Sequence, residues 1–296
     1  MPTDSSRRIA FSATGRRASP PTIAALMNAA LETPGLLSLA AGFTDNGSLP
    51  MAAVQAAVNE LAGRQDLEPL QYGTNQGRPL LRRQLAAHLT HWEPGIGDAE
   101  ADKSFFVTNG SQQALYLAMQ VLCEPGDIVL VDRPTYFVYL EMLRAMGVRA
   151  VSLPIDETGR LDFDALEARL RTLAASGDHA RIRAVYFVSY FSNPSSRCLQ
   201  PGEKRRLAAV LQAHDLVVPV VEDAAYRDLF FARPAEAPSV LGLTEWAEFP
   251  RLYLSTLTKP FSTGLKVGYG YCTDRDWLGR MLHTKGHHDF GTANFN

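Results

Sequence analysis

The sequence predicts an α/β protein, a three-layer sandwich in which helices cover both faces of a mostly parallel β-sheet. Short β-rich runs alternate with helical patterns through the middle of the chain, which is the order that builds parallel sheets. Two of these runs, DIVLV and LVVPVV, are almost continuously apolar, as expected for strands buried on both faces. The length of 296 residues, with 46% hydrophobic and 20% charged residues, suits one large domain, or one domain and a piece of a second.

The expected elements follow one another along the chain in this alternating order. Strands are expected at residues 105–108, 127–131, 184–189, 216–221, 252–254 and 267–272. Helices are expected at residues 112–122, 163–173, 202–214 and 274–285, most of them opening at a Ser, Asp, Pro or Gly start signal. Ligands of such sheets bind at the carboxyl ends of the strands, so the segments that follow the strands are the first place to look for a site.

The first residues of the chain differ from this pattern. Helical patterns at residues 23–31 and 51–61 flank an irregular stretch, SLAAGFTDNGSLP. We therefore expect residues 1–65 to form an N-terminal arm with helices, residues 66–290 the large domain, and residues 291–296 the start of an absent C-terminal segment. The basic amino terminus lacks an amphipathic stripe, which favours a flexible or partner-gripping arm over a targeting peptide.

Charge and cysteine content argue against several classes of function. Lys and Arg total 29 against 31 for Asp and Glu, a net charge of −2, which gives no electrostatic footprint for nucleic acid or an anionic membrane. No apolar run approaches the roughly 18 residues that indicate a spanning helix. Cys123, Cys198 and Cys272 form no CxxC pair, so we expect neither a disulfide framework nor a zinc ribbon, and the cytoplasm is the simplest location.

Histidines near the carboxyl end are the pattern closest to a metal site. His283, His287 and His288 include an i, i+4 pair. The intervening Lys285 and Gly286 are expected to break the helix, and no carboxylate accompanies the histidines. Because zinc takes three or four protein ligands in most sites, we expect a surface loop here and no metal.

The strongest local constellation is YLSTLTKPFSTGLKVGYGY, residues 253–271. It sets Lys259 among small hydroxyl residues at a strand end, ahead of a Pro/Gly-rich loop and a second cation, Lys266. An ammonium is almost never buried unpaired, so Lys259 is either a solvated loop lysine or a functional amine. In the second interpretation its pKa is lowered by desolvation or a nearby cation, and it acts as a nucleophile that forms a Schiff base. The neighbouring hydroxyls and Lys266 could then bind a phosphate.

A second candidate lies in VTNGSQQAL, residues 107–115. Gly110 allows close backbone approach after a strand, and Ser111 opens a helix. Free N–H groups at a helix start, together with the helix dipole, make an anion site. The same turn occurs in every βα unit, and no phosphate-binding GxxxxGK[ST] motif accompanies it.

Acidic residues follow the most apolar strand, in VVEDAAYRDLFF at residues 220–231. Glu222 and Asp223 must find partners there, because an unpaired carboxylate is costly to desolvate. One alternative is a helix N-cap, and the other is a carboxylate that pairs with the protonated nitrogen of a heterocycle. Tyr226 lies three residues further on, within reach of the same ligand.

Two further strand ends carry polar or aromatic side chains. In FVSYFSNPSS, the proline after Asn193 biases this residue toward an extended conformation that aims its amide outward, although an Asn-Pro pair also marks an ordinary turn. In RPTYFVY, Tyr136 could stack on a flat ligand or belong to the core.

Taken together, these strand ends resemble those of the fold-type I pyridoxal-phosphate enzymes, and among them the class I/II aminotransferases. The matching stretches in chain order are YGTNQGRPLLRRQLA, VTNGSQQAL, DRPTY, SNPS, VVEDAAY and STLTKPFSTGLKVGYG. The match extends from about Gly42 to the end of the chain. The resemblance implies an aspartate-aminotransferase-like large domain that binds pyridoxal 5'-phosphate over residues 66–290.

The resemblance also implies a role for each matching residue. Lys259 would hold the cofactor aldehyde as a Schiff base and then act as general acid and base. Asp223 would keep the pyridine nitrogen protonated, Asn193 and Tyr226 would bond the ring hydroxyl, and Tyr136 would stack on the ring. The phosphate would lie against Gly110, Ser111, Gln112, Thr256, Thr258 and Lys266.

Two more positions extend the implied site beyond the cofactor. Tyr72 would reach the cofactor phosphate of a neighbouring subunit, which implies a homodimer with shared sites. Gly42, together with Asn193, would lie against the substrate. Lys259, Tyr226 and Asp223 form the implied catalytic set.

The implied activity is transfer of an amino group from an α-amino acid to a 2-oxo acid. Other pyridoxal-phosphate chemistry on the same scaffold, a C–S lyase or a cyclising synthase, is an alternative, as is a cofactor-binding but catalytically impaired truncated homologue. Two departures from the family bear on this choice. Lys266 stands where the family has an arginine, whose bidentate fork suits phosphate better. The resemblance also implies a small C-terminal domain that carries the substrate-binding arginine, and we expect this chain to end before it.

Overall fold

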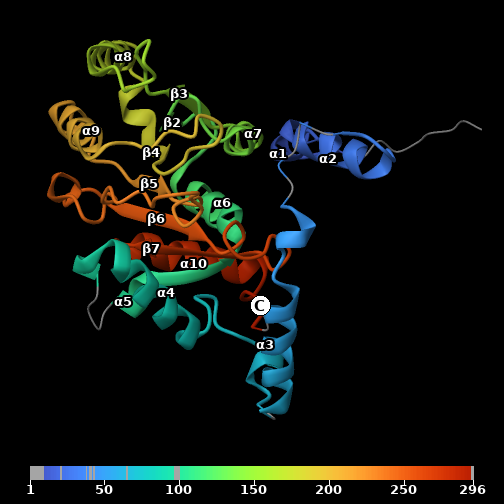
Figure 1. Ribbon diagram of the computed structural model, residues 1–296. Helices are drawn as coiled ribbons and strands as arrows, with labels where there is room; N and C mark the ends of the chain where they lie inside the picture. The colour runs from blue at the N-terminus through green and yellow to red at the C-terminus, as the bar shows by residue number, and fades with distance from the viewer. Residues whose placement is uncertain are drawn as a thin grey trace, which may run out of the picture.

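The computed structural model describes residues 10–20, 22–37, 39, 42, 44–64, 66–96 and 101–294. Its strands are β1 (Phe105–Asn109), β2 (Ile128–Val131), β3 (Arg149–Ser152), β4 (Ile182–Val188), β5 (Val220–Asp223), β6 (Arg251–Thr256) and β7 (Val267–Cys272). They form one sheet in the order β1-β7-β6-β5-β4-β2-β3 (Figure 1). Strand β7 is antiparallel to both neighbours, and the other pairs are parallel. The prediction of a mostly parallel sheet is confirmed.

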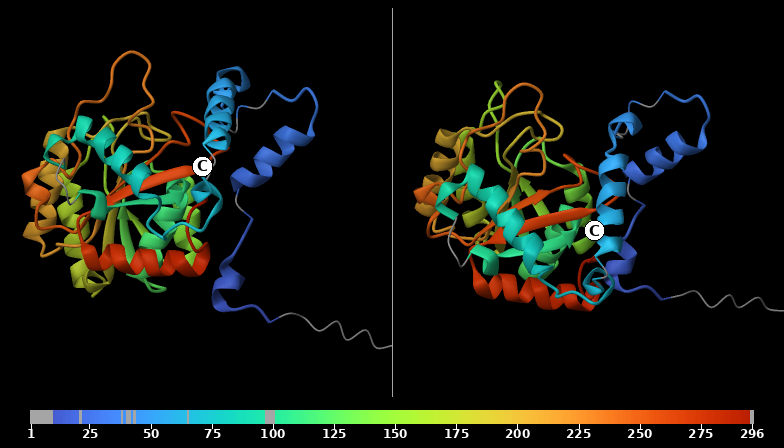
Figure 2. Two further views of the ribbon diagram at one scale, coloured as in Figure 1. Left: turned by 90° about the horizontal axis from the view of Figure 1, so that it is seen from below. Right: turned by 60° about the horizontal axis from the view of Figure 1, so that its bottom comes forward.

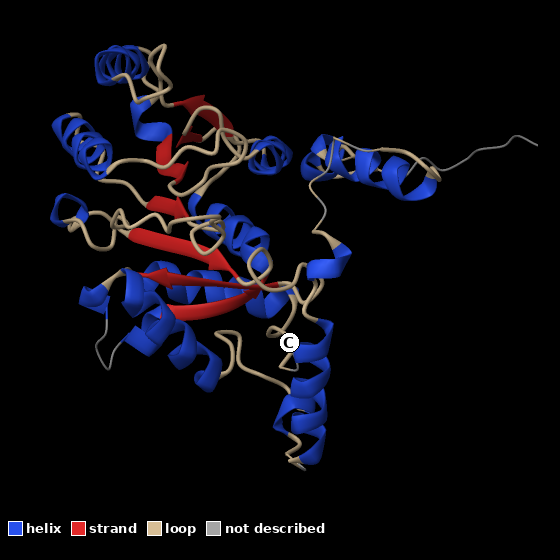
Figure 3. Ribbon diagram, viewed as in Figure 1, coloured by secondary structure: helices blue, strands red, loops and turns tan. Residues whose placement is uncertain are grey.

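Helices cover both faces of this sheet. The helices are α1 (Ala13–Arg17), α2 (Thr22–Glu32), α3 (Met51–Gly63), α4 (Pro79–Trp92), α5 (Ala101–Ser104), α6 (Gly110–Leu122), α7 (Phe137–Met146), α8 (Phe163–Ala175), α9 (Pro201–Ala213) and α10 (Arg275–His288). Helices α6, α7 and α10 lie against one face, and α8, α9 and α4 against the other (Figure 3). The predicted three-layer sandwich is therefore confirmed.

Strand β2 shows why the sequence runs are continuously apolar. Val129 and Val131 belong to the core cluster under α6 and α7, whereas Ile128 and Leu130 belong to the cluster under α8 and α9. Successive side chains of a strand point to opposite faces, so both faces of β2 are buried. Full burial of one such side chain contributes about 1.5–3 kcal/mol, so burial on both faces of β2 stabilises the sheet.

The structure corrects one strand prediction and adds one strand that was not expected. The strand expected at residues 216–221 is instead β5, Val220–Asp223, because Pro219 has no N–H for the ladder and only its carbonyl takes part, accepting from Val185. Strand β3, Arg149–Ser152, was not predicted. It is a short, partly exposed strand at one end of the sheet order, so it lacks the apolar run that identifies the central strands.

The expected helix break near the carboxyl end is also wrong. Helix α10 continues through Gly286 to His288. A Cβ at Gly286 would lie only 2.5 Å from the side-chain nitrogen of Asn75, so this glycine permits close packing within the helix. Lys285 is buried and pairs with Asp289 at 3.0 Å. Across residues 101–294 and the other described ranges, no group of three or more potential metal ligands is present.

The N-terminal helices lie outside the three layers (Figure 2). Helices α2 and α3 contain no buried residues. Helix α1 is attached to the end of α7, where Arg17 Nε donates to the carbonyl of Ala145 at 3.0 Å. A cation at this place also complements the negative end of the α7 dipole. The proposed division at residues 65 and 290 stays a prediction.

Within the described ranges, no helix has both the length and the apolar composition that are needed to cross a bilayer.

Candidate active site

The carboxyl ends of the parallel strands surround a cavity of about 310 Å³. The cavity is formed by segments that follow β1, β2, β4, β5 and β6, as expected for an α/β sheet. Its lining consists of Asn109, Gly110, Ser111, Gln112, Tyr136, Val188, Asn193, Asp223, Ala225, Tyr226, Thr256, Thr258, Lys259 and Lys266. Most of the residues selected from the sequence thus share one cavity, although they are spread over more than half of the chain.

The start of helix α6 forms one end of the cavity. Gly110 has a positive φ of 72°, which a residue with a side chain rarely adopts. Gly268 of β7 packs against this turn so closely that a Cβ would lie 2.4 Å from the backbone nitrogen of Ser111. The unpaired N–H groups at the start of a helix are an anion site, and Thr258 and Lys266 line the same cavity. This end of the cavity is suited to a phosphate.

Lys259 follows strand β6 at the side of the cavity. Its Nζ lies 5.7 Å from the centre of the Tyr226 ring. Desolvation lowers the pKa of Lys259, the charge of Lys266 lowers it further, and the carboxylate of Asp223 opposes both effects. A lowered pKa increases the fraction of neutral amine, which is the form that attacks a carbonyl. Lys259 is an exposed residue that lines the cavity, and its role as a Schiff-base amine stays a prediction.

Asp223 is the last residue of β5 and is 4% exposed. We expected Asp223 to follow the strand or to cap a helix, and it occupies neither position. One carboxylate oxygen accepts a hydrogen bond from the backbone N–H of Ala225 at 3.0 Å, and the other accepts from the hydroxyl of Tyr186 at 3.0 Å. Burial raises the pKa of Asp223, while the two donors and Lys259 oppose the rise. A buried carboxylate that lines a cavity is a natural partner for a protonated ring nitrogen.

Asn193, Tyr226 and Tyr136 complete the wall around Lys259 and Asp223. The side-chain amide of Asn193 donates to the hydroxyl of Tyr226 at 3.4 Å. Tyr136 lies directly before α7, and burial raises the pKa of its hydroxyl to about 12. These aromatic and amide groups can recognise a flat ring that carries a hydroxyl group.

Tyr72 and Gly42 do not line this cavity. Tyr72 is 81% exposed, and its ring meets Phe290 edge-on with centroids 5.8 Å apart. Gly42 is exposed in the segment before α3, with no atom within 4 Å of a built Cβ. Their assignments to a neighbouring subunit and to the substrate stay predictions.

Three lining residues were not predicted from the sequence: Asn109, Val188 and Ala225. Asn109 stands immediately before α6, and a helix start signal at Asn could have identified it. Val188 is the last residue of β4 and carries no polar group that would have distinguished it from other strand residues.

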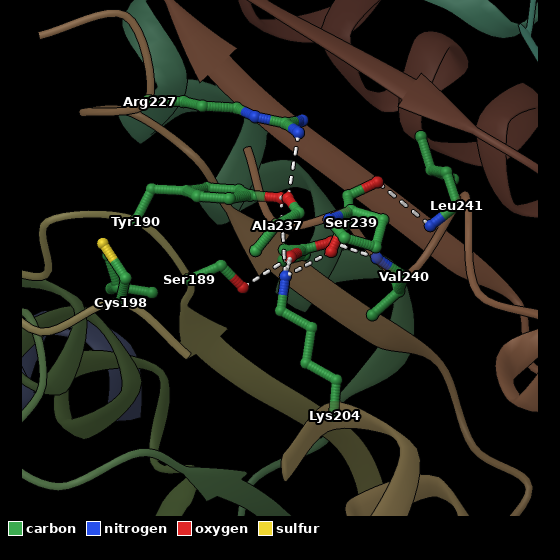
Figure 4. A network of polar contacts seen from close by, with 12 residues as sticks. Ser189, Tyr190, Cys198, Lys204, Arg227, Ala237, Ser239, Val240 and Leu241 are labelled. Atoms are coloured by element: carbon green, nitrogen blue, oxygen red, sulfur yellow. Dashed lines mark hydrogen bonds and ion pairs between the residues drawn. The ribbon is translucent and has the colours of Figure 1, made fainter. Parts of the chain in front are cut away.

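Behind the cavity, a buried ion pair holds the far side of β5 (Figure 4). Glu222, fully buried, points away from Asp223 because neighbouring strand residues face opposite sides. Its carboxylate pairs with Lys204 of α9 at 2.6 Å and accepts hydrogen bonds from the hydroxyl of Ser189 and, at 2.7 Å, from the backbone of Val240. The helix N-cap considered for Glu222 is therefore wrong.

A second buried pair lies beside the first. Arg227, one residue after Tyr226, pairs with Glu93 at 2.8 Å. Glu93 also accepts from the backbone N–H of Ser239 at 2.8 Å. The two pairs tie the segments that carry Asp223 and Tyr226 to the loop that includes Ser239 and Val240. Both pairs lie behind the part of the cavity wall that carries Asp223 and Tyr226.

The sheet, its helix layers and this convergence of an amine, a buried carboxylate and a helix start define the class of fold-type I pyridoxal-phosphate enzymes. The sequence model of the family "Aminotransferase class I and II" matches residues 34–288. The chain belongs to this family, and its sheet and helix layers are those of an aspartate-aminotransferase-like large domain.

Individual relatives agree with the family. The chain is 30% identical over 241 residues to aromatic-amino-acid aminotransferase 1 of Thermococcus litoralis, a match that covers 81% of this chain and 55% of that protein. It superimposes on LysN, the α-aminoadipate aminotransferase of Thermus thermophilus complexed with N-(5'-phosphopyridoxyl)-L-leucine, with a TM-score of 0.78 and 28% identity, covering 96% of this chain and 67% of that one.

A relative of another kind is the uncharacterized HTH-type transcriptional regulator YjiR of Escherichia coli. It is 29% identical over 201 residues, 68% of this chain and 39% of that protein. The chain spans just over half the length of the aminotransferase from Thermococcus litoralis and less than half of YjiR.

Proposed function

We propose that this chain binds pyridoxal 5'-phosphate and moves an amino group from an α-amino acid to a 2-oxo acid. The observation that supports this most strongly is that Lys259 and Asp223 line one cavity. An amine and a buried carboxylate around one flat-ligand cavity meet the two demands of the cofactor, an attachment for its aldehyde and a partner for its ring nitrogen.

The residues of the cavity fit this cofactor. The close contact of Gly268 with the start of α6 leaves backbone N–H groups of Ser111 and Gln112 for the phosphate. The hydroxyls of Thr256 and Thr258 and the cation of Lys266 add to this cradle. The proposed ring contacts are Tyr136, Asn193, Asp223 and Tyr226.

When bound, the cofactor supplies an electron sink for negative charge at the substrate Cα. Lys259 Nζ would hold the cofactor through its aldehyde and would move the proton at the substrate Cα. Asp223 holds the proton at the ring nitrogen, because its carboxylate is the counter-charge. Asn193 and Tyr226 orient the ring through its hydroxyl. Tyr136 keeps water from one face of the ring.

We further propose a homodimer in which Tyr72 of each subunit reaches the site of the other. Tyr72 lies on a surface that includes the exposed Leu67 and Leu70, which are 74% and 79% exposed. Clusters of large exposed apolar side chains are typical of interfaces between subunits. Gly42 would then lie near the substrate, and the cytoplasm remains the expected location.

A single-turnover experiment tests the proposed reaction. The chain is loaded with pyridoxal phosphate, freed of excess cofactor, and mixed with aromatic amino acids, 2-aminoadipate, glutamate or alanine. A transaminase releases one 2-oxo acid per bound cofactor and loses the visible absorption band, which returns after a 2-oxo acid is added. With an S-alkylcysteine and a sulfonium amino acid added to the panel, a C–S lyase or a cyclising synthase gives several turnovers with no acceptor.

The second candidate is a cofactor-binding sensor, which the likeness to the regulator YjiR favours. In that case the chain binds the cofactor and gives a visible band, but no amino acid of the panel yields an oxo acid. Failure to bind pyridoxal phosphate at all contradicts both candidates.

Replacement of Lys266 by arginine tests the phosphate cradle. Lys266→Arg keeps the positive charge and adds a fork that binds two phosphate oxygens, so we expect equal or tighter cofactor retention, by up to about tenfold for one added charge-assisted hydrogen bond. Dialysis followed by measurement of the remaining visible band gives the retention. Lys285→Arg, at a buried lysine outside the cavity, is the control. Weaker retention in Lys266→Arg would contradict the assignment.

A further inference from the structure

Tyr186 contacts the carboxylate of Asp223 from inside the core. Its hydroxyl donates to Asp223 Oδ2 at 3.0 Å, and the residue is fully buried. In the pairing of β4 with β5, Tyr186 lies opposite Val221, two residues before Asp223. Side chains two residues apart share a face of the sheet, so Tyr186 and Asp223 point into the same layer, under α6 and α7.

The ring of Tyr186 is held by a second tyrosine. Tyr139 of α7 is equally buried, and the two rings are stacked with centroids 3.9 Å apart and an angle of 27° between their planes. Burial raises the pKa of the Tyr186 hydroxyl well above its ordinary value, so this group keeps its proton. Tyr186 is therefore a fixed donor, and an ionised carboxylate accepts hydrogen bonds without donating any.

Several other groups lie around the Asp223 carboxylate. Its other oxygen accepts the backbone N–H of Ala225. The charge of Lys259 faces it across the cavity and favours the ionised carboxylate. Buried or half-buried ionisable groups also surround it, namely Asp132, Tyr136, Tyr139 and Tyr226. Among the described residues, Tyr186 is the side chain that donates a hydrogen bond to this carboxylate.

We propose that Tyr186 is a positioning residue that acts through Asp223, keeping this carboxylate ionised and aimed at the cofactor's ring nitrogen. The inference rests on the proposed function. Burial favours the neutral acid, whereas a hydrogen bond donated to the carboxylate favours the charged form. Without the Tyr186 hydroxyl, the proton on the ring nitrogen passes to Asp223, leaving a neutral acid and a neutral pyridine. The electron sink is then weaker.

The test compares two variants that each remove one buried hydroxyl from the same stacked pair. Tyr186→Phe removes the donor to Asp223. Tyr139→Phe is the matched control, because the Tyr139 hydroxyl has no hydrogen-bond partner among the described residues. Chains of residues 1–296 are loaded with pyridoxal phosphate labelled with ¹⁵N in the ring, and the nitrogen chemical shift reports directly whether the ring nitrogen is protonated.

For Tyr186→Phe we expect the ¹⁵N shift to move toward the value of unprotonated pyridine and cofactor retention to fall about tenfold, as for loss of one hydrogen bond to a charged group. Tyr139→Phe should keep the wild-type shift. In an Asp223→Asn background, Tyr186→Phe should change retention less than about twofold if it acts through the carboxylate, because coupled positions are not additive.

The outcomes separate this inference from the proposed function. Equal shifts in both tyrosine variants, an unchanged shift in Tyr186→Phe, or a full loss of retention that persists in the Asp223→Asn background would overturn the role of Tyr186 alone. A wild-type chain that binds no labelled cofactor overturns the proposed function, and this inference with it.

Discussion

Lys259→Ala is expected to abolish covalent attachment of pyridoxal phosphate. The amine of Lys259 lines the cavity with a lowered pKa, and alanine offers no nitrogen to the aldehyde. Borohydride reduction of the loaded wild-type chain should fix the cofactor on a peptide containing Lys259, and the variant should yield no labelled peptide. Turnover should fall by at least about 10²–10⁴, the range that one positioned general acid or base contributes.

The fold should survive this change. Lys259 is an exposed residue that contacts the ring of Tyr226 and interacts electrostatically with Asp223 and Lys266. Lys266→Ala is the matched control, because it removes the other lysine of the same cavity. That variant should still form the reducible adduct, with weaker retention. A reducible adduct that persists in Lys259→Ala would show that a different amine binds the cofactor.

Most residues that touch the cavity could be predicted from the sequence because they lie at or just beyond the end of a strand. A parallel sheet brings the carboxyl ends of its strands to one edge. Asn193, Asp223 and Lys259 each stand beside an apolar run, so a local pattern was enough to select them. Their convergence is a property of the sheet, and the structure supplies the distances.

The residues behind the cavity could not be predicted in the same way. Tyr186 lies within the apolar run AVYFV, where a tyrosine is indistinguishable from an ordinary core aromatic residue. Lys204 lies in EKRR beside Arg205 and Arg206, and no local sequence pattern indicates which of these three side chains is buried. Their partners are 37 and 18 residues away in the chain. Only the tertiary packing pairs them.

Among these cations, Lys204 should be the one whose removal costs the most stability. Lys204 and Glu222 are 1% and 0% exposed and lie 2.6 Å apart. Lys204→Met leaves the Glu222 carboxylate buried without its cation, so we expect the free energy of unfolding to fall by about 3–5 kcal/mol. Lys204→Met/Glu222→Gln removes both charges, while a glutamine can still accept from Val240 and donate to Ser189. The double variant should recover most of the loss, as measured by urea unfolding.

Arg205→Met provides the matched control, since it lies next to Lys204 on α9 and pairs with Glu245 at 3.2 Å, with side chains 53% and 37% exposed. An exposed pair contributes about 0–1 kcal/mol, so the two neighbouring substitutions should differ several-fold in cost. Equal losses in Lys204→Met and Arg205→Met would mean that the buried carboxylate finds other compensation. The same result would remove the argument that Lys204 and Glu222 hold the far side of β5 in place for Asp223.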